Sequence, residues 1–124
     1  MTSATQRPAG LLLPSYKVRD YFPVAKRLPV DIPKGFWNER DWRRARLVRV
    51  PLRKVIATQT WLSRGGIRHH SRPNARPDGD DFPWMLEYQD KYYMFDGHHR
   101  ACIDRYRGKI DIDARVRRVE EFRR

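Results

Sequence analysis

The sequence of 124 residues has a single cysteine, Cys102, and no apolar run near the length of a membrane span. One thiol excludes an internal disulfide framework and is typical of proteins in a reducing compartment. A bilayer span needs about 20 consecutive apolar residues. The leucines at 11–13, which precede Pro14, are also too few for the apolar core of a signal peptide. We therefore predict a cytoplasmic protein with no membrane partner.

Acidic residues are scarce relative to basic ones. Against 27 Lys and Arg there are 15 Asp and Glu, which gives a formal net charge of +12. Residues 1–54 alone carry 13 basic and 4 acidic residues, a net charge of +9. Such an excess favours a polyanionic partner, DNA above all. The alternative is a protein that has a basic face with no nucleic-acid role.

Long helices are excluded from the first 35 residues, because prolines recur there. This segment belongs to a proline-rich basic arm that we place at 1–45. Two alternatives stay open for it, an arm packed onto the rest of the chain and a free basic tail. The prolines are Pro8, Pro14, Pro23, Pro29 and Pro33.

A short helix is predicted near the end of the arm. Asn38 is a good N-cap, and Asp41 stands at the third helical position. Arginines then project as a basic surface that would contact nucleic-acid phosphates, or would simply be solvated. They are Arg40, Arg43, Arg44 and Arg46.

Apolar residues are almost missing from 63–82, which we predict to be a long loop, either functional or a disordered insertion.

On its two sides the pattern predicts a small α+β domain at 46–124. An extended segment bends at Pro51, and a β-hairpin turns near 89–91. A helix runs from Asp96 to Gly108, with Asp96 as its cap and Cys102 on its apolar side. Alternation then predicts a half-buried strand, with four residues facing the core. These four are Ile110, Ile112, Ala114 and Val116.

The start of that helix, Gly97-His98-His99-Arg100, has the chemistry of an anion site. A helix N-terminus offers unpaired N–H groups and a partial positive charge, and glycine allows close approach. Arg100 adds a permanent charge, and both histidines can donate hydrogen bonds. The alternative is a purely structural turn. The histidine pairs lack the spacing of a strong metal motif, so no dedicated metal site is predicted.

The stretch "YYMFDGHHRACIDRYRGKIDIDARV" resembles the ParB/sulfiredoxin-like superfamily, and the upstream "VRVPLRKVIATQ" extends the likeness over about residues 46–119. The resemblance implies a ParB-like fold that holds a nucleotide or nucleic-acid phosphate. His98 stands where sulfiredoxins have their reactive cysteine, which disfavours that chemistry. The implied phosphate-binding residues are Thr58, Gln59, Gly97, His98, His99 and Arg100.

Of the activities in that superfamily, a DNA nuclease or NTPase fits this short chain best, as in small phage or plasmid proteins. His98 would transfer the proton, and His99 or Asp96 would orient it. ATP, ADP or CTP would be the nucleotide, with Mg²⁺ bound through phosphate. If the chain is phage-encoded, its compartment is the bacterial host cytoplasm.

Two further functions stay open. One is a non-catalytic protein that binds DNA or a host protein, in which Arg43 and Arg44 matter more than Arg100. The other is a small-molecule kinase of the serine type, suggested by Asp96, Gly97, His98 and Arg100.

Overall fold

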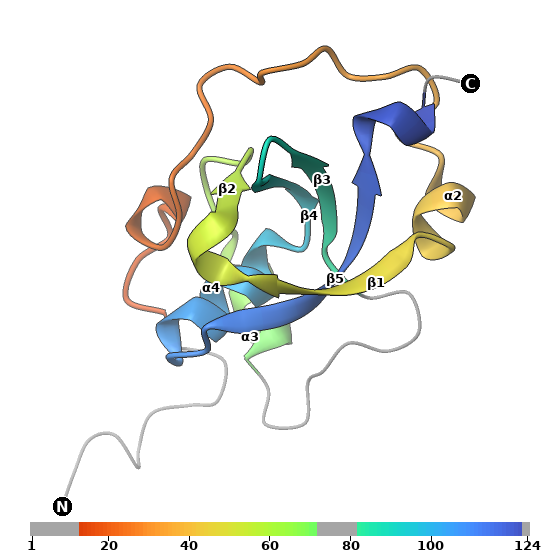
Figure 1. Ribbon diagram of the computed structural model, residues 1–124. Helices are drawn as coiled ribbons and strands as arrows, with labels where there is room; N and C mark the ends of the chain where they lie inside the picture. Colours follow the sequence, from red (N-terminus) through yellow and green to blue (C-terminus); the bar gives the residue numbers. More distant parts are fainter. Residues whose placement is uncertain (1–12, 72–81, 123–124) are drawn as a thin grey trace, which may run out of the picture.

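The computed structural model describes residues 13–71 and 82–122, which form a small mixed α/β structure around one five-stranded sheet (Figure 1). This agrees with the fold class predicted from the sequence. The elements are η1 (Val18–Asp20), α2 (Glu39–Arg43), β1 (Arg46–Pro51), η2 (Leu52–Lys54), β2 (Val55–Ala57), α3 (Arg64–His70), β3 (Trp84–Tyr88), β4 (Lys91–Asp96), α4 (His98–Tyr106), β5 (Asp111–Arg118) and η3 (Val119–Phe122).

The strand order is β1-β5-β3-β4-β2. β1 and β5 are antiparallel, as are β3 and β4, whereas β3 pairs with β5 and β2 with β4 in parallel. The predicted bend at Pro51 is confirmed, because one 3-10 turn there separates β1 from β2. The predicted hairpin is also confirmed. Gln89 and Asp90 both have positive φ, 49° and 64°, as a tight two-residue hairpin turn requires.

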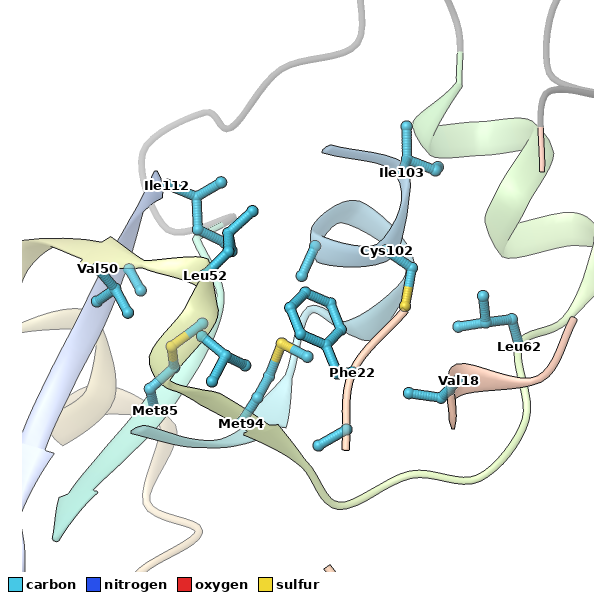
Figure 2. Packing of buried hydrophobic residues seen from close by; sticks show 14 of the residues in the cluster. Val18, Phe22, Val50, Leu52, Leu62, Met85, Met94, Cys102, Ile103 and Ile112 are labelled. Carbon is cyan, nitrogen blue, oxygen red and sulfur yellow. The ribbon is translucent and has the colours of Figure 1, made fainter. Parts of the chain in front are cut away.

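One face of the sheet packs against α3, α4 and the η1 segment. Met85 and Met94 project from the central strands into this layer and are fully buried (Figure 2). Val18 and Phe22 reach it from the N-terminal arm, and Cys102 reaches it from α4. Burial of these apolar side chains is the main force that holds the helices on the sheet.

The opposite face of the sheet carries an aromatic cluster. Trp42 is fully buried and stacks on Trp84 with ring centroids 5.3 Å apart. Its indole Nε1–H donates to the carbonyl of Phe36 at 2.6 Å, so the polar edge of the ring is satisfied. Phe36, Leu86 and Val119 complete the buried part of this cluster. The short α2 is therefore anchored by its tryptophan.

From Leu13 onward, the arm packs onto the sheet, the first of the two alternatives. Val24 forms a parallel bridge with Ala57 of β2, and Lys17 forms an antiparallel bridge with Trp61. Val18 N–H also donates to the carbonyl of Thr60 at 3.0 Å. The arm thereby pairs with backbone groups of the β2 edge and of the segment that follows it.

Three sequence predictions were wrong in detail. Residues 64–70 form α3 rather than loop, and 72–81 lie outside the described residues. α4 begins at His98 and ends at Tyr106. Ile110 precedes β5 and is 77% exposed, because Lys109 and Ile110 belong to the turn that follows α4 rather than to the sheet. The alternation holds from Ile112 to Val116.

None of the helices in 13–71 and 82–122 is long and apolar enough to cross a bilayer.

Candidate functional site

The turn between β4 and α4 is built around Gly97. Its φ of +89° lies in the left-handed region, and it takes the N-cap position of α4. A β-carbon at this position would lie 2.7 Å from the Cα of Pro83. Glycine is therefore required twice, for conformation and for close approach. Asp96 is exposed at the end of β4, and the prediction that it caps the helix was wrong because Gly97 occupies that position.

His98 is buried inside the turn, with an exposed fraction of 2%. Its Nε2 accepts hydrogen bonds from the backbone N–H groups of Thr58 and Gln59, at 3.1 and 3.3 Å. An accepting Nε2 places the proton of the neutral ring on Nδ1. Burial, together with the neighbouring His99, lowers the pKa of His98 to about 4. The ring is therefore neutral at physiological pH and ties the segment after β2 to α4.

The next residue, His99, makes a similar contact with the start of α3. Its Nε2 accepts from the backbone N–H of Ser63 at 2.9 Å and lies 3.2 Å from the Ser63 hydroxyl. Burial lowers the pKa of His99 as well. The ring occupies space beside Gly66 that a β-carbon there would enter, at 2.4 Å. His99 therefore holds the first turn of α3 against α4.

The structure brings together Thr58, Gln59 and His98, three of the residues implied as phosphate-binding, through the acceptor nitrogen of the histidine. Arg100 is 8% exposed and lines a hollow of about 570 Å³ with Asp104 and Arg107. Neither His98 nor His99 lines this hollow. The side chains of the Asp96–Arg100 turn therefore do not converge on one site. The rings of His98 and His99 instead bind backbone groups of the segment between β2 and α3.

The four arginines near α2 differ in their partners. Arg43 pairs with Glu39 at 2.7 Å, and Arg46 lies 3.6 Å from Glu121. Arg40 and Arg44 are exposed and form no ion pair with the described part of the chain. The predicted cap of α2 is confirmed, since the Asn38 side chain accepts from the Asp41 N–H at 3.3 Å.

No group of three or more His, Cys, Asp or Glu side chains within 13–71 and 82–122 is placed to hold a metal ion. Cys102 is fully buried, and burial raises its thiol pKa to about 12. The thiol is thus neutral, which confirms the prediction of a core residue.

Fold and turn together define a small basic α/β protein in which two neutral histidines fasten a helix and a loop to α4. The family model described as "Antitoxin VapB-like" matches residues 27–120. The chain belongs to the VapB-like antitoxin family. No curated protein and no solved structure matches the chain.

This membership corrects the sequence-based interpretation. The assignment to the ParB/sulfiredoxin-like superfamily was wrong, and so were the nuclease or NTPase function and the nucleotide-binding role drawn from it. The short motif Asp96-Gly97-His98-His99-Arg100 carried that assignment. The structural roles of its glycine and histidines are enough to explain why these residues stand there. A short motif alone does not distinguish such structural roles from those of a ligand site.

Sequence reasoning missed the contact between α3 and α4. Two signals were present. Ser63 is a good N-cap, and its side chain accepts from the Gly66 N–H at 3.0 Å. Ile67, four residues later, is the buried residue of the helix. The pattern did not indicate a helix for two reasons. Two adjacent glycines lower the helix propensity, and a single apolar residue gives no helical periodicity.

Proposed function

We propose that this chain is an antitoxin that binds a protein toxin and whose basic surface binds DNA. The family match over residues 27–120 is the observation that carries the proposal. That range includes α2, all five strands of the sheet and the start of η3, so it covers both faces of the sheet. Among the alternatives left open by the sequence, the non-catalytic binder of DNA or a protein is the one this supports.

The toxin-binding half is supported by exposed apolar side chains on the aromatic face. Trp37 is 61% exposed, yet its ring is held edge-on by Phe36 at 4.7 Å between centroids. Phe36 in turn stacks on Phe122, which lines a groove of about 510 Å³ formed with residues 28–34. Ile32 in that groove is 39% exposed. An exposed tryptophan packed on an aromatic cluster, near a groove lined by both apolar and charged residues, is typical of the anchor residues of protein interfaces.

The DNA-binding half is supported by charge. The net charge of +12 is concentrated in the first 54 residues, and a protein with such a field attracts phosphate backbones and releases their counterions. A protein toxin alone does not require this excess of one sign. DNA is therefore the second partner of the proposal.

A growth assay tests the toxin half. The tagged chain is purified from its native cells, and the protein that remains bound at high salt is identified. Expression of that protein alone should arrest growth, and co-expression of this chain should restore it. A captured protein that does not arrest growth, or an arrest that the folded chain does not relieve, would contradict the proposal.

A matched pair of variants locates the contact. Trp37→Ala should weaken binding of the captured toxin about tenfold, since a truncated aromatic anchor costs roughly 1–2 kcal/mol or more. Tyr106→Ala is the control, because this ring is also exposed, at 48%, but lies at the end of α4. Equal losses in both variants would place the toxin elsewhere.

A further inference from the structure

The acidic residues of the chain are unevenly distributed around the fold. Between Asp41 and Asp78 the sequence holds ten Lys and Arg and no acid. Acids on β3, β5 and η3 pair instead with arginines of β1 and β5. Arg49, for example, lies 2.8 Å from Asp111 and 3.2 Å from Asp113. Positive charge is therefore neutralised on that side of the sheet.

The positive charge of η1 and α3 is not neutralised in this way. Lys17 and Arg19 in the η1 segment are exposed and form no ion pair within the described residues. The same holds for Arg64 and Arg68, which share one face of α3 because they are four residues apart. The nearest acid in sequence, Asp20, is engaged by the Ser15 hydroxyl.

An exposed tryptophan lies beside the cations of the η1 segment and precedes those of α3 in the chain. Trp61 is 58% exposed, and Lys17 Nζ lies 6.0 Å from the centroid of its ring. Lys17, Arg19, Thr60 and Trp61 line a small hollow of about 110 Å³. In Figure 2, Leu62 lies between Val18 of η1 and the helix α3. Arg64 follows Trp61 by three residues and begins α3, so the cations of this helix start close to the ring along the chain.

The position of Trp61 is fixed by backbone contacts on both sides. The N–H of Val18 donates to the carbonyl of Thr60 at 3.0 Å, and the N–H of Leu62 donates to the carbonyl of Tyr16 at 2.8 Å. The backbone that carries the ring is thus already ordered, so binding of a partner costs only the freedom of the side chain. This favours a stacking contact over a ring that is merely solvated.

We propose that this Lys17–Trp61 surface, with Arg64 and Arg68, binds single-stranded DNA. The four cations contact successive phosphates, and an unpaired base stacks on Trp61. Duplex DNA covers both faces of its bases with neighbours, so it offers nothing to stack on an exposed indole. The inference rests on the DNA half of the proposed function and specifies its site and its substrate.

Fluorescence anisotropy with a labelled 25-nucleotide DNA, as a single strand and as a duplex, tests the proposal. The wild-type chain should bind the single strand more tightly. Lys17→Ala/Arg19→Ala should lose about tenfold in affinity for the single strand, and the slope of log K against log salt should become shallower by about 1.4, as expected for two phosphate contacts on a single strand. Trp61→Ala should lose affinity for the single strand about fivefold or more, and Trp61→Phe should retain most of it.

Two further double variants remove the same charge elsewhere. Arg53→Ala/Lys91→Ala changes two exposed cations near the β3–β4 turn and should alter affinity less than about threefold. Arg40→Ala/Arg44→Ala tests the rival surface on α2. A larger loss in the α2 variant than in the Lys17 variant, tighter binding of the duplex, or no effect of Trp61→Ala would each overturn the inference.

These outcomes separate the inference from the function on which it rests. Preferential duplex binding leaves the proposed DNA function standing and removes only the assigned surface. The wild-type chain could instead relieve growth arrest by the toxin but bind neither the single strand nor the duplex at low salt. That result would contradict the DNA half of the proposed function and the inference with it.

Discussion

The imidazole of His99 occupies the space beside Gly66 that a β-carbon would enter, at 2.4 Å from the ring. Helices α3 and α4 can approach this closely because residue 66 has no side chain. The same ring accepts a hydrogen bond from the Ser63 N–H, so it cannot turn away without losing that bond. The contact joins the first turns of both helices.

Gly66→Ala should therefore destabilise the protein, although alanine is the better helix former. We expect a loss of about 1–3 kcal/mol in the free energy of unfolding, from the displaced ring and its lost bonds. Gly65→Ala is the matched control, since nothing lies within 4 Å of a β-carbon there. It should stabilise α3 by up to about 1 kcal/mol. Urea unfolding of both variants measures the difference, and equal effects would show that the close contact is not formed.

A second glycine pair separates backbone conformation from steric contact. Gly97 and Gly108 have nearly the same positive φ, 89° and 88°, but only Gly97 faces Pro83. Gly108→Ala should cost about 1–2 kcal/mol through conformation alone. Gly97→Ala should cost clearly more, because Pro83 is in the way. Similar midpoints for the two variants in thermal unfolding would contradict the position of Pro83.

Stability should fall in mild acid because His98 is held neutral. Its pKa is about 4 in the folded chain, against an ordinary value of 6.5 for histidine, so the unfolded chain takes up the proton first as the pH falls. The stabilising contribution is complete above pH 6.5 and is lost as the pH falls towards 4. It amounts to about 3 kcal/mol, at roughly 1.4 kcal/mol per unit. His99 acts in the same direction, since its pKa is also lowered.

Urea unfolding between pH 8 and pH 4 measures this dependence. His98→Phe should be less stable at pH 8, because the N–H groups of Thr58 and Gln59 lose their acceptor. Its stability should nevertheless fall less steeply with acid than that of the wild type. A variant with the wild-type slope would show that another group is responsible. His69→Ala, at an exposed position, is the control.

Cys102 should be unreactive in the folded protein. It is fully buried, and its raised pKa leaves almost no thiolate at neutral pH. A thiol reagent should therefore modify it only when α4 opens, at a rate that rises with urea. Rapid modification in native buffer, comparable with that of the unfolded chain, would contradict the packing of α4 on the sheet.

Much of the fold could be predicted from local pattern. The cap at Asn38, the bend at Pro51, the hairpin and the alternation from Ile112 to Val116 are each consequences of residues close in sequence. Such features depend on backbone preference and on a half-buried face, and both can be read along the chain.

The family and the role of the histidines could not be predicted in this way. The motif at 96–100 satisfied the rules for an anion site, and only the tertiary structure showed that His98 and His99 accept hydrogen bonds from backbone N–H groups 36 to 40 residues away. Local spacing does not determine which distant N–H groups meet a ring.

The sequence by itself determined the excess of positive charge, the mixed α/β class and the glycine at the β4–α4 turn, since these follow from composition and local conformation. The tertiary structure decided that Trp42 is buried while Trp37 and Trp61 are exposed. It also decided which cations keep their charge uncompensated. The physical reason is that burial and ion pairing depend on segments far apart in the chain, which only the folded sheet brings together.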